Sequence, residues 1–145
     1  MAYCIEAQVQ VEAGGARALD QLTDQGGSGN RDTAVLDQAI ADADALINSY
    51  VAKQRAVPLS PVPDVIRKSS QEIAVYLLRA QKRMVTELEQ ATHDSRMRWL
   101  EQVAKGYVTL GVDPQPAKSA LVSPAVVLCD DAETELTAEN TKGAW

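Results

Sequence analysis

The chain has 145 residues, a length at which a single domain with its own core is the rule. Apolar residues make up 46% and charged residues 23%, so the composition is that of a folded globular protein rather than a disordered one. The net charge of −6 excludes a basic footprint for duplex DNA. With one histidine and two widely separated cysteines, Cys4 and Cys129, the chain has neither zinc-ligand spacing nor a disulfide framework.

Aromatic residues make up only 4%, which argues against a stacking platform for single-stranded nucleic acid. No apolar run approaches the roughly 18 residues of a membrane span. The first six residues carry neither a basic patch nor an apolar stretch, as a signal peptide would. We therefore expect a soluble protein made in a reducing cytoplasm, with no membrane contact.

The first half of the chain predicts three helical segments. Gly14 and Gly15 interrupt the stretch from Ile5 to Leu22, which favours two short helices over one. A polar, glycine-rich loop follows over residues 23–32. A longer helix is then expected over residues 33–52, capped by Asp32. Its apolar positions recur at helical spacing: Leu36, Ile40, Ala43, Ile47, Tyr50 and Val51.

Prolines separate this helix from the next. Pro58, Pro61 and Pro63 make residues 55–62 an extended connection, and Pro63 suits the first turn of a helix. Residues 64–105 fit either one long helix or two. Thr86 with Glu89 matches a capping box, so we favour a break near residues 83–85. The inward positions are expected at Ile66, Ile73, Leu77, Ala80 and Met84, then at Leu88, Met97, Leu100, Val103 and Ala104. Gly106 suits the end of the second helix.

The predicted fold is all-α: a small bundle of about three main helices plus short N-terminal helices over residues 1–111. Residues 112–145 form a second unit, an extended arm with short β-strands at most, since Pro124 lies within its apolar stretch. Such an arm is either disordered or ordered by a partner. Its candidate partner-docking residues are Leu121, Val122, Ala125, Val126, Val127, Leu128, Leu136 and Trp145.

Charge is divided into three blocks. Residues 1–52 carry a net charge of −6, residues 53–105 carry +4 and residues 106–145 carry −4. Surfaces of opposite charge suit a protein whose copies meet head to side, with unlike surfaces in contact. The alternative is that the three blocks are simply three solvated faces. A basic middle block also suits nucleic acid, but the negative total favours pairing between subunits. The candidate inter-subunit charges are Asp37, Asp44, Arg67, Lys68, Arg79, Arg83 and Arg96. Asp42 and Asp44 are expected on a solvated side of their helix.

No constellation of catalytic, cofactor-binding or metal-binding residues emerges. A calcium loop starting at Asp24 would have Gly26 at its third position and Val35 at its twelfth, which leaves too few oxygen ligands. His93 has Asp94 and Ser95 as direct neighbours, and consecutive residues on a helix cannot form a triad. We therefore expect His93 on an exposed helix face, and no enzyme.

The order of these features resembles the Mu-like phage family of small head–tail connector proteins. The matching segments are Met1–Cys4, Gln21–Asp24 before the glycine loop, Ala39–Tyr50, Val57–Leu59 with Val62–Pro63, Ile73–Leu78, and Arg98–Gly106 with Leu110–Gly111. They cover about residues 1–111.

The resemblance implies a structural protein of the virion, an adaptor ring subunit in the neck between portal and tail. It implies a homo-oligomer, usually a twelve-fold ring, whose partners are the portal protein and a downstream neck or tail-completion protein. DNA would pass through the channel without specific binding. The alternatives are a tail-completion or other neck protein, and a prophage-encoded helical regulatory or nucleic-acid-binding domain.

Overall fold

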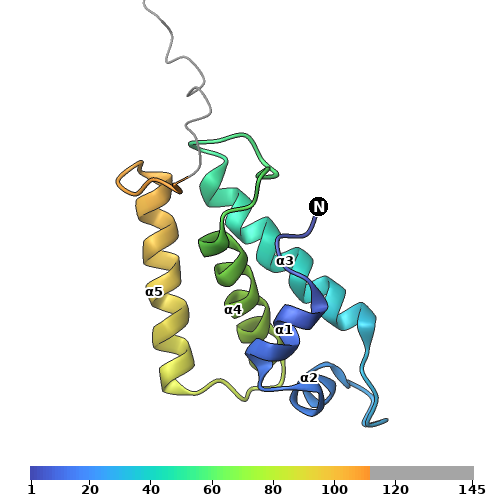
Figure 1. The fold of residues 1–145 in the computed structure, drawn as a ribbon. Helices are drawn as coiled ribbons and strands as arrows, with labels where there is room; N and C mark the ends of the chain where they lie inside the picture. Colours follow the sequence, from blue (N-terminus) through green and yellow to red (C-terminus); the bar gives the residue numbers. More distant parts are fainter. Residues whose placement is uncertain (112–145) are drawn as a thin grey trace, which may run out of the picture. The chain divides into compact units, whose positions relative to one another are not determined.

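The computed structural model describes residues 1–111, which form five α-helices and no β-strand (Figure 1). The all-α prediction is therefore confirmed for this part of the chain. The helices are α1 (Glu6–Ala13), α2 (Ala16–Thr23), α3 (Thr33–Val51), α4 (Asp64–Gln81) and α5 (Glu87–Ala104). The predicted arm and its docking residues lie outside the described residues.

Glycine sets the corner between the two short helices. Gly14 and Gly15 have φ values of 99° and 116°, which side-chain-bearing residues rarely adopt. The Gly15 N–H donates to the Gln10 carbonyl at 2.9 Å and closes the end of α1. The prediction of two short helices over this stretch is therefore confirmed.

The start of α3 is fixed by Asp32, as predicted. Its carboxylate accepts hydrogen bonds from the N–H groups of Ala34 and Val35 at 3.0 and 3.3 Å, which satisfies two of the free amides of the first turn. The apolar stripe of α3 is buried as its spacing indicated, apart from the half-buried Tyr50. Its buried residues are Leu36, Ile40, Ala43, Ile47 and Val51.

The break between α4 and α5 is confirmed, and backbone hydrogen bonds define it. The Met84 N–H donates to the Arg79 carbonyl, and the Arg83 N–H donates to the Ala80 carbonyl, which is a Schellman ending. Arg83 occupies the left-handed position of that motif, with a φ of 56°. The capping box at Thr86 and Glu89 then starts α5.

Three inward positions were predicted wrongly around this break, and the first of them is Ala80, which is exposed near the end of α4. Met84 is 63% exposed and Leu88 is 77% exposed. Met84 lies beyond the last residue of α4, so helical phase no longer applies to it, and Leu88 lies in the first turn of α5 at the end of the bundle. Leu77 is half-buried and packs against the core, beside the fully buried Leu78.

Helix α4 is the centre of the body. It contacts all four other helices, whereas α5 packs mainly on α3 and α4 (Figure 1). The largest fully buried apolar side chains come from every helix: Val9, Leu19, Leu36, Ile47, Val51, Ile66, Ile73, Leu78 and Leu100. None of the described helices combines the length and the hydropathy needed to cross a membrane.

Candidate functional site

A buried polar network joins the N-terminal segment to α3 and α4. Asp44 is only 8% exposed, and its carboxylate accepts hydrogen bonds from the Tyr3 N–H at 2.9 Å and the Ser70 hydroxyl at 2.8 Å. The same hydroxyl lies 3.2 Å from the Cys4 sulfur. The prediction that Asp44 lies on a solvated, subunit-facing surface is therefore wrong, because the N-terminal segment packs over that side of α3.

The Tyr3 hydroxyl extends this network to the proline-rich connection. It donates to the Asn48 side-chain oxygen and accepts from the Leu59 N–H at 3.1 Å. Burial raises the pKa of the neighbouring Cys4 thiol, and the Asp44 charge adds to the rise while the Ser70 hydroxyl opposes it. The thiol therefore stays protonated near neutral pH, in keeping with a structural role.

Ion pairs fill the cleft between α4 and α5. The Arg96 guanidinium binds both carboxylate oxygens of Glu72, with Nη2 at 3.0 Å from Oε1, and this raises the pKa of Arg96. Arg79 pairs with Glu89 across the same cleft. A cavity of only about 90 Å³ remains between these side chains. The charges of this cleft therefore neutralise one another and hold α5 against α4.

Two further bases also find acids within the chain. Lys68 of α4 pairs with Glu12 of α1 and lies 3.9 Å from Glu72. Arg67 pairs with Asp64 one turn earlier at 2.7 Å. Four of the five bases predicted to face a neighbouring subunit thus have partners in their own chain.

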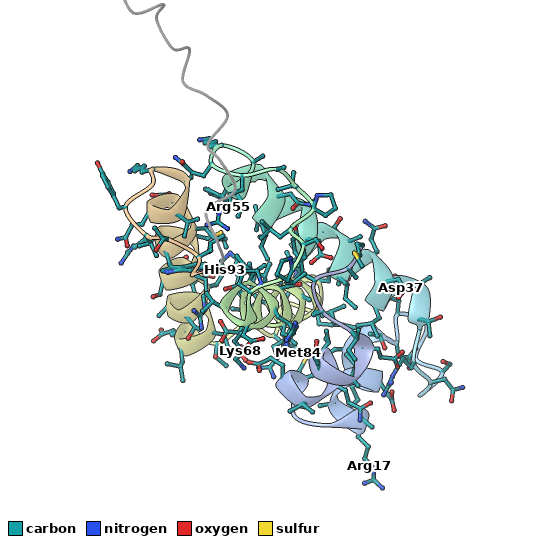
Figure 2. All side chains as sticks on the ribbon, turned by 45° about the horizontal axis from the view of Figure 1, so that its top comes forward. Arg17, Asp37, Arg55, Lys68, Met84 and His93 are labelled. Atoms are coloured by element: carbon teal, nitrogen blue, oxygen red, sulfur yellow. The ribbon has the colours of Figure 1, made fainter. Side chains whose placement is uncertain are left out.

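His93 lies in the cleft rather than on an exposed face, so that prediction is wrong (Figure 2). Its ring stacks on Tyr76 with 3.8 Å between centroids and 7° between planes. Its Nδ1 atom is buried without a hydrogen-bond partner within residues 1–111. Burial lowers the pKa of His93, against the opposing charge of Asp94. The neutral imidazole acts here as a packing surface.

The glycine-rich loop is organised by its own aspartate. The Asp24 carboxylate accepts hydrogen bonds from the N–H groups of Gly29, Ser28 and Gly26 at 2.6, 3.0 and 3.1 Å. These bonds, the one from Gly29 foremost, lower the pKa of Asp24. Across residues 1–111 no three His, Cys, Asp or Glu side chains gather as metal ligands. Asp24 is thus occupied by the loop backbone.

Asp37 and Arg83 differ from the other predicted charge-face residues. Both are exposed, and neither side chain has a hydrogen bond or ion pair with any residue of the described part. Asp37 lies on the outer side of α3 (Figure 2). Arg83 lies in the turn between the end of α4 and the start of α5. Of the seven candidate charges, these two are left available to a partner.

Comparison with known proteins places this all-α body among bacteriophage proteins. The chain matches the family described as Bacteriophage Mu, Gp36 over residues 3–126. It is 37% identical over 102 residues to "Gene product J" of Escherichia phage Mu, covering 70% of this chain and 71% of that protein. It is 30% identical over 96 residues to "Mu-like prophage FluMu protein gp36" of Haemophilus influenzae, covering 66% and 67%. The chain therefore belongs to the Bacteriophage Mu Gp36 family.

Proposed function

We propose that this phage protein is a structural component of the virion, a subunit of the connector ring that joins the portal to the tail. Its family membership supports a phage role, and the sequence resembles small head–tail connector proteins over about residues 1–111. The observation that carries the proposal is the all-α body of those residues, because tail-completion and tail-terminator proteins tend to be sheet-rich. The role proposed is architectural and involves no catalysis, metal or cofactor.

The ion pairs weaken the case for a nucleic-acid-binding domain. A DNA-reading helix needs unpaired cations aimed at phosphates or bases. On α4 and α5, however, Lys68, Arg79 and Arg96 are already neutralised by acids of the same body. The connection from α3 to α4 runs from Ala52 to Pro63, too long for the tight turn of a helix-turn-helix. We propose that DNA passes the ring without specific binding.

The proposed partners are other copies of this chain, the portal protein and a downstream neck or tail protein. The body supplies the contacts between copies, and residues 112–145 serve as the docking arm. The neck of the virion is the proposed location, after synthesis in the host cytoplasm. A twelve-fold ring is the arrangement that the resemblance favours.

The test is deletion of the gene from a phage that encodes it, with complementation by the full chain. We expect filled heads and separate tails in the deletion lysate, and joined particles after complementation. Electron microscopy of purified particles should place labelled protein between portal and tail. Normal particles from the deletion strain, or absence of the protein from virions, would refute the connector role.

A further inference from the structure

An open groove lies between the N-terminal segment and α3. Its volume is about 590 Å³, and its apolar wall includes the exposed side chains of Ala2, Ile5, Ala41 and Ala45. Ile5 is 61% exposed although it is a large apolar side chain. The exposed, unpartnered Asp37 is one of the residues that line the groove, and no Lys or Arg side chain lines it. The groove therefore suits an apolar side chain accompanied by a positive charge.

The turn between α4 and α5 presents that combination. Met84 in this turn and Leu88 in the first turn of α5 are exposed apolar side chains, and the unpaired Arg83 directly precedes Met84. Arg83 is also the single non-glycine residue with a positive φ in residues 1–111. A side chain in that conformation costs about 1 kcal/mol or more relative to glycine, and such strain collects where a particular side chain is needed.

One chain cannot bring these two surfaces together. The groove lies beside the middle of α3 near the N-terminus, whereas the turn lies at the end of the bundle remote from it (Figure 1). Contact between them therefore requires a second copy, and it joins two different surfaces. Repetition of such a head-to-tail contact gives a ring when the rotation between copies closes and an open filament when it does not, whereas a self-complementary contact stops at a dimer.

We propose that the α4–α5 turn of one copy docks into the groove of the next, with Met84 and Leu88 against its apolar wall and Arg83 facing Asp37. This inference rests on the proposed ring and names its subunit interface. The charge pair fixes register and orientation, and the apolar side chains leave water. The four bases that form ion pairs within their own chain do not contribute to this proposed contact between copies.

Disulfide trapping tests the contact directly. In full-length chain carrying Cys129→Ser, we combine copies with Ala41→Cys in the groove and copies with Met84→Cys in the turn. We expect a two-chain product from the mixture and none from either variant alone, because the surfaces are different. A single chain with both substitutions should give a ladder of multimers. Ser49→Cys, exposed on α3 but outside the groove, replaces Ala41→Cys as the matched control.

Charge exchange supplies an independent measurement. Asp37→Arg and Arg83→Glu should each weaken self-association at least about tenfold in sedimentation, and the double variant should recover most of the loss. Arg83→Gly removes the charge and relieves the positive φ, so we expect a higher melting temperature together with weaker association. A merely misfolded variant would not show that pair of effects.

Three results would overturn the proposed interface: cross-linking of either variant with itself, a yield no better than the Ser49→Cys control, or no recovery in the charge exchange. Electron microscopy of the parent chain and of phage particles distinguishes failure of the proposed interface from failure of the connector role. Rings that form without the trapped contact leave the connector role standing and refute these surfaces. Absence of both rings and trapped product, with the chain absent from virions, refutes both.

Discussion

Replacing Asp44 by alanine removes the carboxylate that holds the N-terminal segment against α3 and α4. The Tyr3 N–H loses its acceptor, and an unsatisfied buried donor costs about 1–3 kcal/mol. The Ser70 hydroxyl loses a charged acceptor but can turn toward the Cys4 sulfur, which limits that second cost. We therefore expect Asp44→Ala to lower the free energy of unfolding by about 2–4 kcal/mol. The melting temperature should fall by about 10 °C.

The matched control is Asp42→Ala, on the same helix two positions earlier. Asp42 is exposed and accepts one hydrogen bond, from the Gln38 side chain at 2.7 Å. Its loss should change stability by less than about 0.5 kcal/mol. The assay is urea unfolding of the full chain followed by circular dichroism at 222 nm, a wavelength that reports helix. Equal stabilities for the two variants would refute the buried network.

Three more outcomes are expected. Leu78→Ala should cost about 2–5 kcal/mol in urea unfolding and Leu88→Ala less than about 0.5 kcal/mol, and the reverse order would contradict the observed helical phase. Because burial lowers the pKa of His93, the unfolded chain binds its proton more readily, so stability should fall as pH drops below the ordinary histidine pKa of about 6.5. His93→Gln should reduce the change in the urea unfolding midpoint between pH 7.5 and pH 5.5. An unchanged pH dependence of that midpoint would contradict the burial of His93. A chain ending at Gly111 should melt like the full chain yet fail to join heads to tails, and full complementation by it would remove the docking role of the arm.

Much of the fold was accessible from local signals. The cap at Asp32, the break at Gly14 and Gly15 and the capping box at Thr86 each involve groups a few residues apart, so the sequence alone predicts them. Helix bounds agree with expectation to within two residues for the same reason. The burial of side chains near helix ends was less predictable. Met84, for example, lies beyond the end of α4, so the turn and not the helical periodicity determines its exposure.

The surroundings of charged residues were the main failure, because they depend on contacts distant in sequence. Asp44 lies four residues after Ile40 and three before Ile47, beside the buried stripe, and this spacing was the available signal that it faces inward. Its partners Tyr3 and Ser70 come from other segments. The pairing of Arg96 with Glu72 likewise spans two helices, which helical periodicity cannot reveal.

The hydrogen bond between Leu59 and Tyr3 has a consequence for the order of folding on the ribosome. It joins residues 56 positions apart, so the N-terminal segment emerges early and cannot be fixed until the proline-rich connection has followed it. Closing so long a loop carries an entropic cost that local helix formation avoids. The wall of the groove therefore cannot be completed until Leu59 has left the ribosome. A nascent chain shorter than this lacks the finished groove, so under the proposed interface it has no surface to receive the turn of another copy.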